Sequence, residues 1–196
     1  MITLRPGPGT DILLAAARDA GVGRIVAQSY AQNRYARQGG PVKTEDDPLD
    51  PAPPAAMRRT VAAMNHLDEA VTEAGGIALR YGNFYGDTGD AWPDLMRARK
   101  FPIVGDGAGV WSHIHLDDAA AATVLALDHD GPAVYNITDD ESAPARDWLP
   151  VLADALGAGP PRHVPSWLAR LIMGKGLAVM TESRGASNAK ARKELD

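Results

Sequence analysis

Apolar residues recur at helical spacing in two stretches of the first half of the chain. Residues 11–20 place their apolar side chains on one face, and Gly21 follows at a position typical of a helix end. Residues 55–74 repeat apolar side chains every three or four positions and stop at Gly75. Both stretches are therefore predicted to be amphipathic helices.

Short apolar runs stand beside these helices. Residues 24–28, 77–81 and 134–137 are continuous enough to indicate buried strands. A strand, a long loop, a helix and a second strand in that order favour a right-handed parallel crossover. The predicted fold class is therefore α/β with a parallel sheet.

The remaining segments are predicted from turn and cap residues. Residues 38–56 contain five of the fifteen prolines, so we expect a surface loop without a regular element. A helix is expected to start at Asp117 or Asp118, with these carboxylates as its N-terminal caps. The other expected elements are strands at 101–104 and 111–115 and helices at 144–156 and 165–173.

Composition and charge narrow the class of partner. The 196 residues are 45% apolar and 23% charged, which suits one compact body. With a net charge of −5 and scattered basic residues, nucleic acid is not an expected partner. No stretch approaches the roughly 18 apolar residues of a membrane span, so no membrane partner is expected and the default location is the cytoplasm.

Five segments carry distinctive residue combinations. They are GTDILLAAARDAGV at 9–22, LRYGNFYG at 79–86, GDG at 105–107 followed by IHLDD at 114–118, YNI at 135–137 and KARKEL at 190–195. In this order and spacing they resemble the extended short-chain dehydrogenase/reductase family of the NAD-dependent epimerase/dehydratase type.

The resemblance implies a partial Rossmann-like parallel sheet with a small C-terminal α/β substrate lobe. Residues 1–100 would form the remaining part of the Rossmann-like domain and residues 101–196 the substrate lobe, joined as one compact body. NAD or NADP is the implied cofactor, with Tyr81 and Gly82 beside it. The family's GxxGxxG turn, which lets the backbone approach a diphosphate, is absent from the sequence, so we expect an N-terminally incomplete member. Helix 55–74 is the implied homodimer interface.

The family's acid–base pair is also absent. The resemblance places a tyrosine and a lysine four residues apart on helix 55–74, where this chain has Thr60 and Met64. At the family's serine position the choice is Ser29 or Tyr30, and Tyr30 could act as the acid. The alternative is an interfacial tyrosine whose hydroxyl is satisfied by a neighbour.

Two further residues bear on the substrate. The resemblance gives Asn83 a substrate contact through its amide, and a turn residue is the alternative. Trp111 stands where many sugar-nucleotide enzymes carry an arginine that clamps the diphosphate. A nucleotide sugar is therefore not expected, although a small-molecule substrate is. His113, His115 and Asp117 lack a fourth metal ligand, and the sequence has no cysteine, so no metal site is predicted.

The functional hypothesis is an atypical or impaired NAD(P)-dependent oxidoreductase or epimerase, acting through Ser29 or Tyr30. The alternative is a non-enzymatic module that binds a small molecule or a protein and buries its open sheet edge in a partner. An inactive remnant and a start assigned too late along the chain are the other open alternatives.

Overall fold

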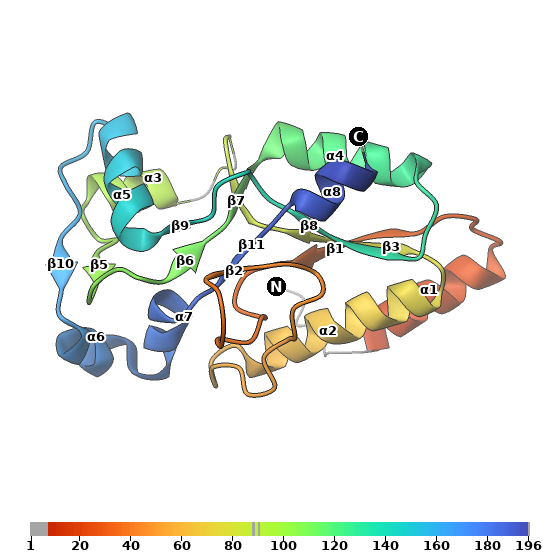
Figure 1. The fold of residues 1–196 in the computed structure, drawn as a ribbon, viewed down its shortest axis with the longest axis horizontal. Helices are drawn as coiled ribbons and strands as arrows, with labels where there is room; N and C mark the ends of the chain where they lie inside the picture. The colour runs from red at the N-terminus through yellow and green to blue at the C-terminus, as the bar shows by residue number, and fades with distance from the viewer. Residues whose placement is uncertain (1–7, 88, 90, 196) are drawn as a thin grey trace.

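The computed structural model describes residues 8–87, 89 and 91–195 (Figure 1). At its centre is a parallel sheet in the order β1 (Val26–Tyr30), β3 (Ile77–Tyr81) and β8 (Ala133–Ile137). The α/β class and the parallel crossover are confirmed.

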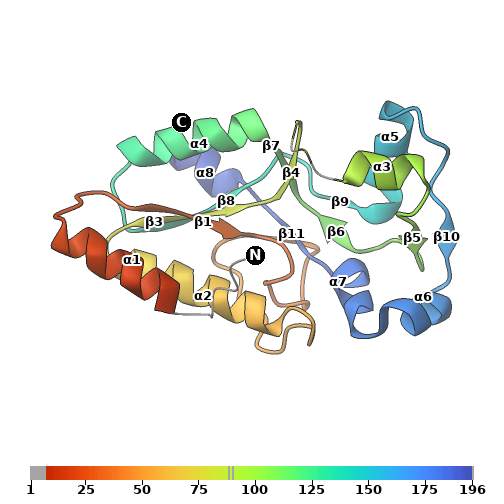
Figure 2. The same cartoon turned by 180° about the vertical axis from the view of Figure 1, so that it is seen from behind.

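Helices cover both faces of this sheet. α1 (Pro8–Asp19) and α2 (Arg58–Glu73) lie side by side on one face, and α4 (Leu116–Asp128) and α8 (Ala189–Glu194) lie on the other (Figures 1 and 2). Both faces of β3 are consequently buried, which explains why four of its five residues are apolar or aromatic and why the fifth, Arg80, is buried as well.

The two faces of the sheet differ in chemistry. The face toward α4 and α8 is the main apolar core, formed by Ile77, Leu79, Tyr81, Ile114, Ala119, Ala126, Tyr135, Ile137, Ala191 and Leu195. On the face toward α2, Ser29, Arg80 and Asn136 stand in register across the three strands. All three are buried, so a polar row crosses the interior.

A smaller lobe lies beyond the carboxyl ends of the strands, at the left of Figure 1. It contains α3 (Trp92–Arg97), β5 (Ile103–Val104), β6 (Val110–Trp111), β9 (Ala143–Pro144), α5 (Ala145–Ala155), β10 (His163–Val164), α6 (Ser166–Met173), a 3-10 turn at Gly174–Gly176 and α7 (Leu177–Thr181). β4 (Asn83–Tyr85) and β7 (His113–His115) pair in parallel between the lobe and the main sheet.

Two local expectations were wrong. The segment 38–56 contains a short strand, β2 (Val42–Lys43), because it pairs with β11 (Gly185–Ala186) near the other end of the chain. α4 begins at Leu116, and its cap is His115, whose Nδ1 accepts the Asp117 backbone N–H at 3.2 Å. The two aspartates lie in the first turn, where their negative charges interact favourably with the helix dipole, but neither is the N-cap.

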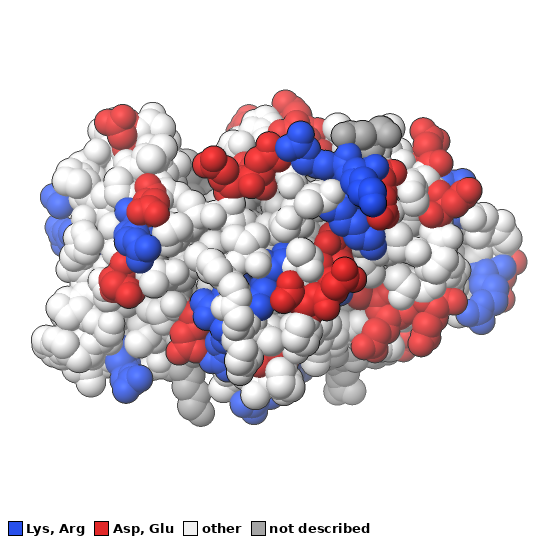
Figure 3. Space-filling model, viewed as in Figure 1, with Lys and Arg blue, Asp and Glu red and all other residues white. Residues whose placement is uncertain are grey.

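The second half of the chain contributes to both parts of the fold. β8 and α8 belong to the main sheet and its cover, while the elements from β9 to α7 belong to the lobe. None of the helices in the described part of the chain combines the length and apolar character needed to cross a membrane. On the face drawn in Figure 3, basic and acidic side chains lie among one another.

Candidate functional site

Tyr30 and Asn83 meet at the carboxyl edge of the parallel sheet. Tyr30 ends β1, and Asn83 follows β3 after Gly82. The Tyr30 hydroxyl donates to Asn83 Oδ1 at 2.6 Å, and Asn83 Nδ2 donates to the Ser112 carbonyl at 3.0 Å. Because the amide nitrogen is held by Ser112, the amide oxygen is fixed toward the phenol. Ligands of open α/β sheets bind at this edge.

A cavity of about 440 Å³ opens at this pair. Its described lining residues are Tyr30, Gly82, Asn83, Phe84, Asp87, Trp92 and Leu116. The structure therefore brings together three of the six site residues suggested by the sequence, Tyr30, Gly82 and Asn83.

Burial raises the pKa of Tyr30 from 10.0 to about 12. The phenol is consequently protonated at neutral pH and can donate a hydrogen bond, but it is poorly suited to accept a proton as a base. This differs from the family pattern, in which a lysine lowers the tyrosine pKa.

Gly82 is fixed by close packing. Its N–H donates to the Ile137 carbonyl at 2.9 Å, and the next amide, that of Asn83, donates to Ser112 at 2.8 Å. A β-carbon on Gly82 would lie 2.9 Å from the Ser112 carbonyl oxygen. A side chain here would therefore push β4 away from β7 and displace Asn83.

Ser29 and Tyr81 point away from the cavity, on opposite faces of the sheet. Ser29 is buried under α2, where its Oγ accepts from Arg34 Nη1 at 2.9 Å. The Tyr81 hydroxyl lies 2.6 Å from Thr123 Oγ1 on α4. Both hydroxyls are engaged in contacts with other elements of the fold.

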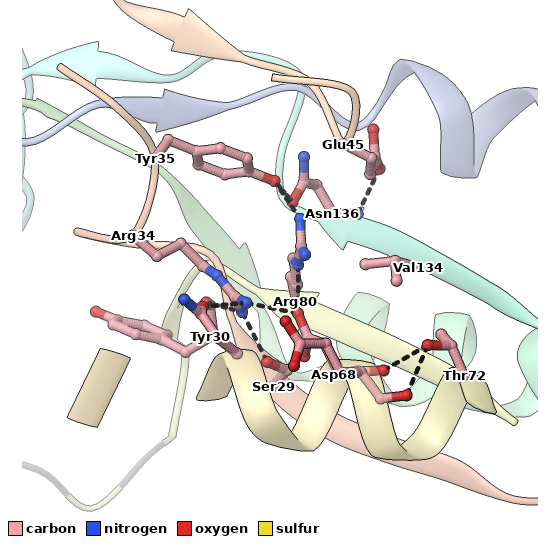
Figure 4. Close-up of polar contacts among 12 residues, drawn as sticks. Ser29, Tyr30, Arg34, Tyr35, Glu45, Asp68, Thr72, Arg80, Val134 and Asn136 are labelled. Atoms are coloured by element: carbon pink, nitrogen blue, oxygen red, sulfur yellow. Dashed lines mark hydrogen bonds and ion pairs between the residues drawn. The ribbon is translucent and has the colours of Figure 1, made fainter. Parts of the chain in front are cut away.

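A buried charge cluster lies behind Ser29 (Figure 4). Asp68 Oδ2 is 2.6 Å from Arg34 Nη2 and 2.7 Å from Arg80 Nε. Arg80 Nη1 donates to the Tyr35 hydroxyl at 2.9 Å, which in turn donates to Asn136 Oδ1 at 2.6 Å. The cluster joins the loop after β1, helix α2 and two strands of the sheet.

Arg34 also holds the end of β1. Its Nη1 donates to the Tyr30 carbonyl at 3.2 Å as well as to Ser29, and its Nη2 donates to Asn65 Oδ1 at 2.8 Å. The backbone that carries the Tyr30 phenol is therefore attached to α2 through a buried guanidinium.

Trp111 lies in an aromatic cluster next to the cavity. Its side chain is buried, and its ring centroid is 5.6 Å from that of Trp148 and 6.0 Å from that of Trp92. Phe101 completes the cluster at 4.7 Å from Trp92. Trp111 thus borders the cavity only through Trp92.

His113 packs on the rim of this cluster, with its ring 4.8 Å from Trp148. Burial lowers the pKa of His113 from 6.5 to about 4, so the imidazole is neutral at physiological pH. The described residues contain no group of three His, Cys, Asp or Glu side chains placed to hold a metal ion.

On α2, Thr60 is exposed and Met64 is half-buried, and neither lines the cavity. Sequence reasoning missed four cavity residues, Phe84, Asp87, Trp92 and Leu116, and the whole charge cluster. Phe84 could have been found because it directly follows Asn83. Trp92 and Leu116 come from separate elements, and no local pattern places them at the sheet edge.

A second cavity, of about 500 Å³, lies between α4, α8 and the end of β8. Its floor is apolar and includes Ile114, Ile137 and Leu195, and Asp118, Asp139 and Asp140 are at its rim. Burial is the largest cause of the raised pKa of Asp139. None of the site residues suggested by the sequence lines this cavity.

Residues 7–138 match the NAD dependent epimerase/dehydratase family. The chain is 43% identical over 198 residues to a 3-diazoavenalumate denitrifying reductase from a Streptomyces species. This alignment covers 95% of the chain. The protein is therefore a member of the NAD dependent epimerase/dehydratase family.

Solved structures agree on the fold. A dTDP-glucose 4,6-dehydratase double mutant from Streptomyces venezuelae, with NAD and DAU bound, superposes with a TM-score of 0.72 at 26% identity. A UDP-glucose 4-epimerase from Thermotoga maritima, with UDP-glucose, gives 0.69 at 21% identity. Each match covers 95% of this chain.

The chain spans 64% of the length of the Streptomyces reductase, 58% of the dehydratase and 62% of the epimerase. The activities of those longer proteins bear on this chain only as a proposal.

Proposed function

We propose that this protein is an atypical reductase acting on a small molecule, with Tyr30 as the hydrogen-bond donor to the reacting group. The observation that carries the proposal is the Tyr30–Asn83 pair, 2.6 Å apart in a cavity at the carboxyl edge of the parallel sheet. The 43% identity to a reductase of this family supports reduction over epimerisation.

The state of the phenol favours the reductive direction. A reduction adds electron density to a substrate atom, and a fixed donor stabilises that atom as charge develops. Burial keeps the Tyr30 phenol protonated at neutral pH, and its single O–H, which donates to Asn83 Oδ1 in the structure, has to turn from that oxygen to the substrate atom. The reverse, oxidative direction would require a base, and a phenol with so high a pKa is a poor one at neutral pH.

The residues present do not fit the whole dinucleotide that the family uses. The described lining of the cavity holds no lysine or arginine and no glycine-rich turn opening a helix, so nothing there receives a diphosphate. The cavity volume suits a ring and its substituents. The roles belong to this chain's own residues: Tyr30 donates, Asn83 accepts the phenol proton until a substrate atom replaces it, and Gly82 sets the close approach of the strands.

A second candidate function is a non-enzymatic module that binds a small molecule or a protein. It is supported by the absence of a diphosphate cradle among the cavity residues and by Thr60 and Met64 in place of the family's tyrosine and lysine.

Hydride-donor kinetics test the proposal. The purified chain is assayed by NADPH and NADH absorbance against a panel of aryl diazo and carbonyl compounds. A second donor, 1-benzyl-1,4-dihydronicotinamide, has no diphosphate. We expect it to support turnover about as well as NADPH, because the cavity residues do not grip the diphosphate.

Tyr30→Phe should lower kcat by about 10²-fold, the typical loss of one transition-state donor or general acid. The matched control is Tyr85→Phe, an exposed tyrosine outside the cavity lining, which should retain activity. Oxidation of neither hydride donor with any compound would refute the reductase and favour the binding module.

A further inference from the structure

Aromatic side chains form part of the lining of the candidate cavity. Three of its described lining residues carry rings, Tyr30 from β1, Phe84 from β4 and Trp92 from α3. Aromatic faces carry partial negative charge and attract planar rings and cations. A ligand in this cavity therefore meets aromatic side chains supplied by three separate elements.

The charged residue of the described lining, Asp87, also favours a cationic ligand. Asp87 is an exposed carboxylate at the cavity, and the described lining contributes no lysine, arginine or histidine to oppose it. Both the rings and the carboxylate disfavour an anionic group and favour a positive one.

The aromatic cluster beside the cavity places further rings against Trp92. Trp111 packs edge-on against Trp92, with the ring centroids 6.0 Å apart. Trp92 also contacts Phe101 at 4.7 Å and Trp148 at 6.2 Å. Trp92, the largest ring of the described lining, thus packs against other aromatic rings.

We propose that the cavity takes a planar aromatic cation as its substrate, with the ring against Trp92 and Phe84 and the positive charge toward Asp87. The inference rests on the proposed function for the role of this ligand, but binding can be measured without turnover. A nucleoside diphosphate sugar has the opposite charge and is excluded by the same residues.

The oxidised nicotinamide ring is also a planar aromatic cation and could occupy the same cavity. Size and affinity distinguish a substrate from this ring, since a cavity of about 440 Å³ accommodates a bicyclic cation as readily as a single ring. A substrate site should bind the larger apolar cation more tightly than 1-methylnicotinamide.

Calorimetric titration of the full chain tests the inference with 1-methylnicotinamide and four further probes. 1-Methylquinolinium is the cation, quinoline its nearly isosteric neutral form at pH above neutrality, 2-naphthoate an anion of similar size, and UDP-glucose the sugar nucleotide. We expect 1-methylquinolinium to bind about tenfold more tightly than quinoline, with the two anions undetected.

The variant Asp87→Asn tests whether the Asp87 carboxylate recognises the positive charge of the ligand. It should bring the affinities for 1-methylquinolinium and quinoline to within about twofold of each other, because the carboxylate is removed while the rings remain. The control is Asp94→Asn, an exposed carboxylate on α3 outside the cavity lining, which should preserve the preference.

Three results would overturn the inference: quinoline binding as tightly as 1-methylquinolinium, detectable UDP-glucose binding, or tighter binding of 1-methylnicotinamide than of 1-methylquinolinium. None of these depends on hydride transfer. A chain that binds the bicyclic cation but oxidises no hydride donor would retain this ligand class and lose the reductase assignment.

Discussion

Asp68 and Arg34 form an ion pair of 2.6 Å in which the arginine side chain has no exposed surface. Arg80 contacts the same carboxylate oxygen, so one aspartate offsets two buried guanidinium groups. Burial disfavours the charged form of Arg34 and is the largest cause of its lowered pKa, while Asp68 acts in the opposite direction.

Asp68→Asn should therefore destabilise the fold by about 3–5 kcal/mol, the usual effect of removing one partner of a buried ion pair. Urea denaturation followed by circular dichroism measures the change. Asp94→Asn, whose carboxylate pairs with Arg97 at the surface, is the matched control and should leave the unfolding free energy nearly unchanged. Equal stability of the two variants would contradict a structural role for the cluster.

Tyr30 should make stability sensitive to alkaline pH. Its pKa is raised from 10.0 to about 12 by burial, so its contribution is fully present below pH 10.0 and is lost as pH rises through about 12. Tyr30→Phe should lose less unfolding free energy than the wild type over that range, measured by urea denaturation at increasing pH. Parallel losses in both proteins would show that the phenol is not buried as described.

His113 should make the stability of the fold sensitive to acidic pH. Burial lowers its pKa from 6.5 to about 4, so its contribution is present above pH 6.5 and is lost as pH falls toward 4. His113→Gln should therefore reduce the loss of stability on acidification, whereas His163→Gln, at an exposed position on β10, should not. The urea midpoint at the two ends of this pH range measures the difference, and identical midpoint shifts in all three proteins would argue against it.

We propose a homodimer through α2, with α1 at its edge. α1 lies beside α2 and exposes Ile12 and Leu13, with 68% and 70% of their surfaces accessible. Light scattering after size exclusion should give a dimer, and the double change Ile12→Glu and Leu13→Glu should give a monomer. Leu171→Glu on α6, equally exposed at 76%, is the control that should remain dimeric. A monomeric wild type would rule out this interface.

The sequence predicted those parts of the fold that depend on neighbouring residues. The stripe at 55–74 and the run at 77–81 correspond to α2 and β3, since periodicity and continuous apolar character are local signals. The meeting of Tyr30 and Asn83 also follows from a general rule, because both residues stand at the carboxyl ends of adjacent parallel strands.

The remaining features depend on contacts between distant residues. Asp68 is a charged residue in a helix, and such residues are normally solvated, so only the buried approach of Arg34 and Arg80 explains its position. Trp92 and Trp148 are far apart in the chain and meet in a lobe of short elements with little periodicity. Ring contacts of this kind have no local sequence signature.

The row of Ser29, Arg80 and Asn136 across the sheet has a consequence for how the chain finds its native pairing. Successive positions on β3 face different surroundings, Leu79 in the apolar core and Arg80 against Asp68. A slip of one residue would send the guanidinium into the hydrocarbon core and an isobutyl group onto the carboxylate. A misaligned sheet is therefore less stable than the native one. Arg80, whose buried ion pair adds little net stability to the fold, specifies the register of the strands.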